Sequence, residues 1–239
     1  MAVETLLAVD ERERLVAQFA EIAALAGGLA HEIKNPLSTI SLNLELLIEE
    51  VSDGDSPRDR RMLKKLLSLQ QECRRMGGIL EDFLKFARAG QPELVSCDLN
   101  QSVRDFLEFY QPEAAANGIE ISPHLGADLP EVRLDAGLFR QVLLNLALNA
   151  QQAMPRGGLV EIQTRVRDGR VELELIDNGC GMDEKTLSRI FEVFWSTKTS
   201  GSGLGLATVK RIVEAHGGRV LVDSAPSRGT KFTISLPPA

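Results

Sequence analysis

Apolar residues in the first part of the chain repeat with the spacing of helices that pack along one side. Two series advance in steps of mostly four and three residues. A mean step of about 3.5 residues is typical of a helix that packs on another helix. We therefore predict two long helices whose packing positions are Leu15, Phe19, Ile22, Ala26, Leu29, Ile33, Leu37, Ile40, Leu44, Leu47 and Val51 in the first and Leu66, Leu69, Cys73, Met76, Leu80, Phe83 and Ala87 in the second.

The segment between the two series is rich in residues that interrupt helices. It reads Ser52-Asp-Gly-Asp-Ser-Pro57 and is short, which predicts an antiparallel helical hairpin. A single hairpin leaves its packing positions half covered, so two copies should form a four-helix bundle as a homodimer. We also expect a kink near Pro36, where the steps become irregular, because proline has no N–H for the helix ladder.

After Ala89-Gly-Gln-Pro92 the pattern changes to alternating helices and short strands. An Asp168-Gly169 turn between two alternating runs indicates a β-hairpin. The mixture predicts an α+β fold in which an α/β sandwich, with helices on one face of a sheet, follows the hairpin. The expected helices span about 99–116, 136–153 and 203–216, and the expected strands are Ile119–Ser122, Glu131–Leu134, Leu159–Arg167, Arg170–Asp177, Arg219–Asp223 and Lys231–Leu236.

Composition narrows the class of protein. With 239 residues, 44% hydrophobic and 26% charged, the chain has material for a sizeable core and is not disordered or collagen-like. No apolar run approaches the about 18–20 residues of a transmembrane helix, and the start lacks a secretion signal. We expect a cytoplasmic protein or the soluble part of a membrane-anchored one. A net charge of −7 argues against charge-driven nucleic-acid binding. Three scattered cysteines indicate reduced thiols.

His31 lies midway between two packing positions of the first helix. Two residues correspond to about 200° around a helix, so the imidazole should face solvent. Glu32 is adjacent and Asn35 lies one turn further on the same side. An exposed imidazole beside a carboxylate suits a nucleophile whose proton the carboxylate accepts. The alternative is an ordinary surface histidine. A zinc motif is excluded because Asn35 stands where the second histidine would be.

Two segments further along suit a nucleotide and its metal ion. Asn145 and Asn149 share one helical face, where neutral oxygens can hold hydrated Mg²⁺; the alternative is a buried amide pair bonded to backbone. Asp177 ends a strand and is followed by Asn-Gly-Cys-Gly-Met, so that backbone can approach a ligand while the carboxylate accepts a hydrogen bond. The same letters also fit an ordinary turn.

Two more segments suit phosphate groups. Phe191 to Lys198 places aromatic residues before a cation that could reach a terminal phosphate, or simply anchors a mobile loop. Gly201-Ser-Gly-Leu-Gly205 opens a helix whose free N–H groups attract phosphate, which predicts a lid.

Taken together, these segments resemble the boxes of bacterial two-component sensor histidine kinases, in the order of that family and closest to its nitrogen-regulation type. The matching segments are His31–Leu37, Asn145–Asn149, Asp177–Met182, Phe191–Lys198, Gly201–Ala207 and, at the end of the chain, Arg228–Pro237.

The resemblance implies a role for each matched position. His31 would be the phospho-acceptor, Glu32 its acid/base partner and Asn35 a residue used to dephosphorylate the partner regulator. Asn149 would hold Mg²⁺ and Asp177 would accept from the adenine amino group. Lys198 would handle phosphates, more so because Gln152 stands where many relatives have lysine. The implied nucleotide contacts are Asn145, Asn149, Gln152, Asp177, Gly179, Gly181, Met182, Thr197, Lys198, Gly201, Ser202, Gly203, Leu204, Gly205 and Thr230.

The resemblance also implies an organisation and a function. Residues 1–20 would be a signalling extension, 21–91 the dimerisation and phosphotransfer domain, and 92–239 the ATP-binding domain. The expected activity is an ATP-dependent protein-histidine autokinase that passes phosphate to an aspartate of a response regulator receiver domain and also removes it. The alternatives are an ATP hydrolase of the gyrase and heat-shock type and a non-catalytic dimeric scaffold. A hydrolase needs a water-activating carboxylate near Asn149, yet the position four residues earlier is Asn145.

Overall fold

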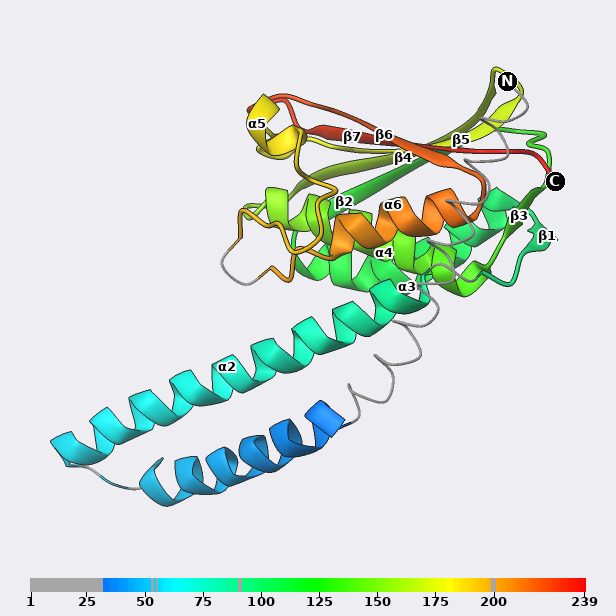
Figure 1. Ribbon diagram of the computed structural model, residues 1–239. Helices are drawn as coiled ribbons and strands as arrows, with labels where there is room; N and C mark the ends of the chain where they lie inside the picture. The colour runs from blue at the N-terminus through cyan, green and yellow to red at the C-terminus, as the bar shows by residue number, and fades with distance from the viewer. Residues whose placement is uncertain (1–31, 53, 55, 90–91, 199–200) are drawn as a thin grey trace. The chain divides into compact units, whose positions relative to one another are not determined.

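The computed structural model describes residues 32–52, 54, 56–89, 92–198 and 201–239 (Figure 1). They fall into two compact units that meet between Arg88 and Ala89. Within the described residues, no helix combines the length and apolarity that crossing a membrane requires.

The first unit is a helical hairpin. Residues 32–52 are helical without a break at Pro36, and α2 (Pro57–Arg88) follows. Ser56 caps α2, because its hydroxyl accepts from the Asp59 amide at 3.2 Å while its own amide donates to the Asp59 carboxylate at 3.2 Å. The hairpin prediction is confirmed. The part of the first helix predicted from Leu15 to His31 lies outside the described residues.

The packing positions of the hairpin divide into a covered half and an open half. Leu44 and Leu66 are 7% and 9% exposed, whereas Ile40 and Leu69 are 48% and 55% exposed. The partner helix thus covers one side of each apolar series and leaves the other side open, as expected for a single hairpin.

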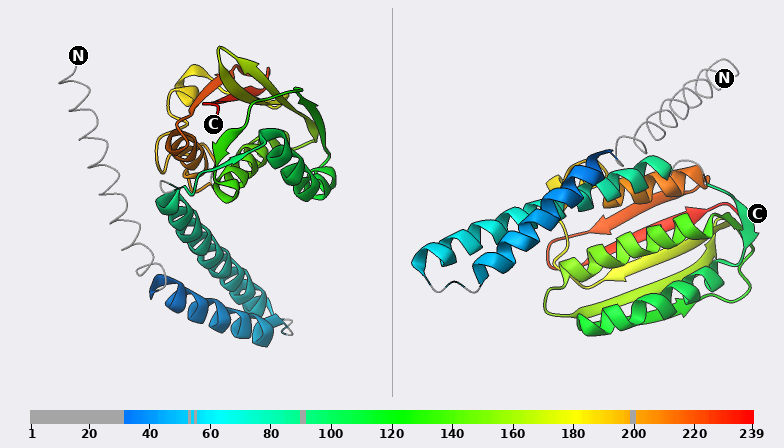
Figure 2. Two further views of the ribbon diagram at one scale, coloured as in Figure 1. Left: turned by 90° about the vertical axis from the view of Figure 1, so that its right-hand side faces the viewer. Right: turned by 90° about the horizontal axis from the view of Figure 1, so that it is seen from below.

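The second unit packs helices on one face of a sheet. The five-stranded sheet has the order β2-β4-β5-β7-β6, with β2 parallel to β4 and the other pairs antiparallel. Its strands are β2 (Ile119–Leu125), β4 (Gly158–Arg167), β5 (Arg170–Asp177), β6 (Arg219–Ser224) and β7 (Thr230–Leu236). Helices α3 (Leu99–Ala116), α4 (Ala136–Ala153) and α6 (Gly205–Ala215) lie against one face, as the right view of Figure 2 shows. The α+β prediction is confirmed.

The sequence pattern did not predict two short elements, a strand and a helix. Strand β1 (Val95–Cys97) pairs with β3 (Val132–Leu134) in a separate ribbon, and α5 (Glu184–Leu187) is a single turn. Neither is long enough to show a periodicity.

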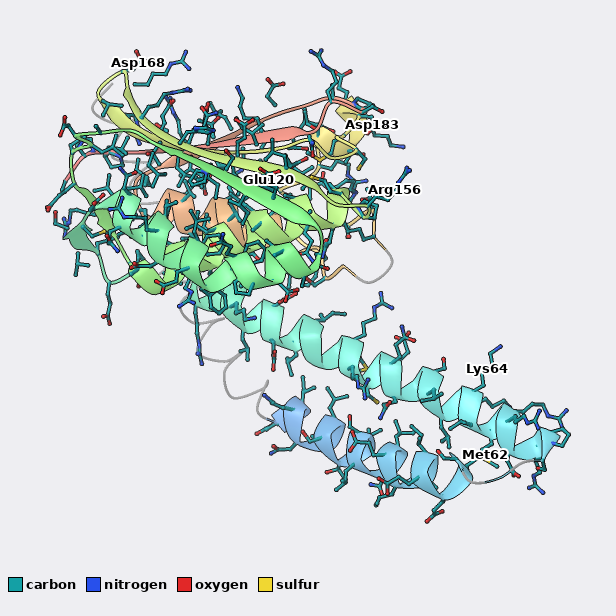
Figure 3. The ribbon with its side chains drawn as sticks, turned by 180° about the vertical axis from the view of Figure 1, so that it is seen from behind. Met62, Lys64, Glu120, Arg156, Asp168 and Asp183 are labelled. Atoms are coloured by element: carbon teal, nitrogen blue, oxygen red, sulfur yellow. The ribbon has the colours of Figure 1, made fainter. Side chains whose placement is uncertain are left out.

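The two ends of the sheet differ in character. Asp168 and Gly169 form the tight turn between β4 and β5 with φ of 50° and 71°, the left-handed conformation that this hairpin type requires. Figure 3 shows Asp168 at one end of the sheet and both Arg156 and Asp183 at the other. The loop that follows β5 therefore leaves from the end opposite the hairpin tip.

Candidate functional site

Asp177, the last residue of β5, is held with one oxygen occupied and one available. The residue is 4% exposed, and its Oδ1 accepts from the Gly179 amide at 2.9 Å and the Thr230 amide at 3.2 Å. In the described part of the chain, Oδ2 has no hydrogen-bond partner. Burial raises the pKa of this carboxyl group, and the two amide donors partly oppose that shift. The arrangement leaves a buried acceptor for a ligand that offers N–H.

Glycines allow two loops to close behind this carboxylate. Gly181 and Gly229 have φ of 64° and 77°. A Cβ on Gly181 would lie 2.0 Å from the Ala225 carbonyl oxygen, and one on Gly229 would lie 1.9 Å from the Asp177 carbonyl oxygen. Only glycine permits these approaches. The turn over residues 225–229 therefore packs directly behind the loop over 178–182.

Ser224 links these two loops, and the sequence pattern did not predict that role. Its Oγ is within 3.0 Å of the Met182 amide and of the Thr230 hydroxyl. A serine at the end of a strand carries no motif, and the contact depends on the pairing of Ser224 with Thr230 between β6 and β7.

Helix α4 presents the two asparagines without internal partners. Within the described residues, neither the Asn145 nor the Asn149 side chain makes a hydrogen bond, so the interpretation as an amide pair bonded to backbone has no support. Asn145 lies against the start of α6, since a Cβ on Gly205 would be 3.6 Å from its Oδ1. At the end of α4, the Cys180 amide donates to the Ala153 carbonyl at 3.1 Å. The asparagine face therefore lies between both glycine loops.

Lys198 reaches the same helix. Its Nζ donates to the Oε1 of Gln152, which is on the C-terminal turn of α4. Partial burial lowers the pKa of the lysine, while the nearby Cys180 thiol opposes that shift. The Lys198 side chain is still exposed, so an incoming phosphate can reach its ammonium group.

The aromatic segment is bound to the second glycine loop. The Phe194 amide donates to the Gly203 carbonyl at 3.1 Å. Phe194 has a backbone φ of 62°, which residues other than glycine rarely adopt. Of the remaining expected contacts, Thr197 is exposed, and Gly201, Ser202 and Gly205 are half-buried. Leu204 is 0% exposed, so it can offer a ligand only its backbone.

The first helix carries the other half of the expected site. His31 lies outside the described residues. Glu32 and Asn35 are exposed on the helix over 32–52. The Asn35 carboxamide has no hydrogen-bond partner within the described residues. The Lys34 ammonium lies 3.4 Å from the Glu81 carboxylate and links this end of the helix to α2.

A groove of about 670 Å³ runs along one side of the hairpin, beside this end. Leu37, Leu80 and Leu84 contribute apolar lining, and Glu45 and Arg74 contribute charge. Taking Leu44 as the inward direction and about 100° per residue, Glu45 is turned to one side and the exposed Ile40 to the other. The groove and the open apolar positions therefore lie on different sides of the hairpin.

Comparisons with known proteins agree with this geometry. The family "His Kinase A (phospho-acceptor) domain" matches residues 21–92, and the family "Histidine kinase-, DNA gyrase B-, and HSP90-like ATPase" matches residues 134–239. The sensor histidine kinase ZraS of Klebsiella oxytoca is 36% identical over 96% of this chain and 48% of its own length. The chain thus spans about a third to a half of the length of the curated relatives it matches.

Two solved structures are also similar. Full-length ShkA in complex with AMPPNP has a TM-score of 0.68 at 31% identity, covering 89% of this chain and 45% of that one. The mycobacterial sensor histidine kinase MprB has a TM-score of 0.52 at 30% identity, covering 62% of this chain and 97% of that one. The chain belongs to the sensor histidine kinases and contains their phospho-acceptor and ATPase-type domains.

Proposed function

We propose that this chain is an ATP-dependent protein-histidine autokinase that phosphorylates His31 and then transfers the phosphoryl group to an aspartate of a response regulator. The observation that carries the proposal is the Asp177 carboxylate, buried, fixed through Oδ1 and open at Oδ2. A buried acceptor of this kind suits the amino group of adenine. The kinship with the ShkA structure, which holds an ATP analogue, supports the same ligand here.

The residues around Asp177 suit a triphosphate. The unpartnered oxygens of Asn145 and Asn149 suit Mg²⁺, which keeps water and phosphate oxygens among its ligands. When bound, Mg²⁺ would neutralise phosphate charge. Lys198, positioned by Gln152, and the amides at the start of α6 would hold the terminal phosphates.

The transfer step needs little covalent chemistry from the nucleotide-binding unit. A ring nitrogen of His31 attacks the γ-phosphorus, an N–P bond forms, and the bond from phosphorus to the bridging oxygen of ADP breaks. Glu32 takes the proton that the imidazole loses. Catalysis then depends on positioning and on charge neutralisation by the cations around the phosphates.

The open apolar side of the hairpin supports a homodimer. Ile33, Ile40 and Leu47 on the first helix and Met62, Leu69 and Met76 on α2 are each between 37% and 55% exposed. In both helices these positions are rotated in the same sense from the inward ones. Because the helices are antiparallel, both stripes face the same side of the hairpin. A second hairpin would cover them and complete a four-helix bundle.

The groove on the other side suits the regulator. Its apolar lining and charged rim fit an amphipathic helix of a receiver domain, and Asn35 is exposed at the same end. Asn35 would orient water toward a phosphoaspartate of that regulator, which makes the chain a phosphatase as well.

We assign residues 1–20 to a signalling extension, 21–91 to the dimerisation and phosphotransfer domain and 92–239 to the ATP-binding domain. We propose that the chain acts in the cytoplasm.

Labelling with γ-phosphate-labelled ATP and Mg²⁺ tests the activity. We expect a label that is lost in acid and kept in base, as a phosphohistidine is. The variant His31→Gln should lose the label while binding ADP like the parent, because His31 is not part of the nucleotide pocket. A label stable in acid would identify a hydroxyl acceptor, and steady phosphate release with no label would identify an ATP hydrolase. Either result would overturn the proposal.

A further inference from the structure

Ser224, at the end of β6, contacts three groups around the proposed adenine pocket. Its Oγ lies 3.0 Å from the Met182 amide nitrogen, 2.9 Å from the Gly229 carbonyl oxygen and 3.0 Å from the Thr230 Oγ1. The sheet register places it there, because Ser224 is paired with Thr230. One hydroxyl therefore links the loop after β5 to the start of β7.

The chemistry of these partners fixes the direction of every hydrogen bond at Ser224. An amide N–H can only donate, and a carbonyl oxygen can only accept. The single proton of Ser224 is therefore directed to Gly229, and its lone pairs accept from Met182 and Thr230. The Thr230 hydroxyl must then be the donor in the bond between the two side chains.

This assignment determines what Thr230 can offer a ligand. With its proton directed at Ser224, the Oγ1 of Thr230 presents only lone pairs. The backbone amide of Thr230 donates to Asp177 at 3.2 Å, so the two residues are held side by side. An ionised Asp177 is also only an acceptor. The polar end of the pocket thus combines two side-chain acceptors.

We propose that Ser224 is a positioning residue that keeps Thr230 an acceptor and so sets the base preference of the pocket. The inference rests on the proposed nucleotide site. A purine with an amino group at C6 can donate to these acceptors, as adenine does. A purine with a keto oxygen at C6 places its lone pairs against those of Asp177 and Thr230. The buried acceptors then stay unpaired, so this purine should bind more weakly.

Binding of ADP and inosine diphosphate, which carries a keto oxygen at C6, tests the proposal by calorimetry without any turnover. The parent protein should prefer ADP. In Ser224→Ala, Thr230 loses its acceptor and can turn its proton toward the keto oxygen. The preference for ADP should therefore fall by about three- to tenfold. Ser224→Thr keeps the hydroxyl and should keep the parent preference.

A purely structural serine gives a different pattern. Ser224→Ala would then weaken both nucleotides by the same factor, and an unchanged preference would overturn the proposal. Adding Ser224→Ala to Thr230→Val completes a double-mutant cycle, in which the serine change should no longer alter the preference. An effect that persists there would also overturn it.

The remaining outcomes separate this inference from the proposed function. If Ser224→Ala does not fold, Thr230→Val alone removes the same acceptor and should lower the preference by a similar factor; an unchanged preference in that variant contradicts the inference. If the parent binds neither nucleotide, the nucleotide site itself is wrong and the inference falls with it. A parent that binds ADP well and a Ser224→Ala variant with the same preference overturn the inference alone.

Discussion

The two units of this chain bury their apolar residues to very different extents. In the described residues of the hairpin, Leu44, Leu66 and Ala87 are the buried apolar side chains. The second unit has a continuous core that runs from α3 to β7 and includes the large side chains Phe106 and Phe139. Because hydrophobic burial is the main stabilising term, the second unit has a core of its own, whereas the hairpin keeps open apolar side chains that the proposed second copy would cover.

The same contrast separates the two kinds of chemistry. Glu32 and Asn35 are exposed, which their proposed roles toward a nucleotide and a docking regulator require. Asp177 is buried, where loss of water strengthens its interaction with a donor. The hairpin therefore provides accessible groups, and the sheet unit provides a buried carboxylate held by two backbone amides.

The largest expected effect lies on the exposed helix. Glu32→Ala should lower the rate of autophosphorylation by about 10²- to 10⁴-fold, the usual contribution of a general base, without weakening the binding of ADP. Asn35→Ala is the matched variant one turn away and should keep autophosphorylation while losing dephosphorylation of the regulator. The measurement is a pair of rates: label gained from ATP and label lost from purified phosphorylated regulator. If Asn35→Ala lost both rates equally, its assignment to the second reaction would be wrong.

The open stripe of the hairpin predicts the next largest effect. Leu69→Asp should weaken the dimer by at least about 3 kcal/mol, because two leucines at about 1.5 kcal/mol each lose their cover. Sedimentation should then show monomers in which the second unit stays folded and still binds ADP. The exposed Gln71 points away from the stripe, and Gln71→Asp adds the same charge as a control. A fully dimeric Leu69→Asp variant would place the interface elsewhere.

Asp177→Asn should separate binding from stability in the sheet unit. Loss of the charge should weaken the binding free energy of ATP by about 1.5–3 kcal/mol, the usual contribution of a hydrogen bond to a charged group. Burial raises the folded-state pKa of Asp177, so its contribution to stability is present below the unfolded-state pKa and is lost as the pH rises through the folded-state value. The variant should therefore gain in Tm relative to the parent between acid and neutral pH.

Thermal unfolding of both proteins across that range provides the measurement. If the Tm of Asp177→Asn instead falls relative to the Tm of the parent as the pH rises to neutral, the carboxylate is stabilised by its amide donors more than burial destabilises it.

The smallest effect compares glycines in the two units. A Cβ on Gly78, in the middle of α2, would meet nothing within 4 Å. Gly78→Ala should therefore stabilise the hairpin by about 0.5–1 kcal/mol through helix propensity. Gly181→Ala should destabilise the sheet unit, because its Cβ would meet the Ala225 carbonyl at 2.0 Å. Urea denaturation measures both, and a destabilised Gly78→Ala dimer would mean that the second copy occupies that space.

Local pattern was enough for most elements of the fold. The predicted bounds of α3, α4 and β5 agree with the structure, because each has a clear periodicity and, for the helices, a capping aspartate. Asp98 accepts from the Asn100 amide at 2.7 Å and Asp135 from the Leu138 amide at 3.0 Å. The short β1 and α5 were missed, since β1 exists only through its pairing with β3.

The sequence by itself determined which residues have the chemistry for the proposed function and that the hairpin would be half covered. The tertiary structure alone decided which side of the apolar series stays open, that one Asp177 oxygen is already occupied, and that Ser224 controls the Thr230 hydroxyl. The physical reason is that periodicity and capping depend on residues a few positions apart. The direction of a buried hydrogen bond depends instead on strands brought together by the register of the sheet, as Ser224 and Thr230 are.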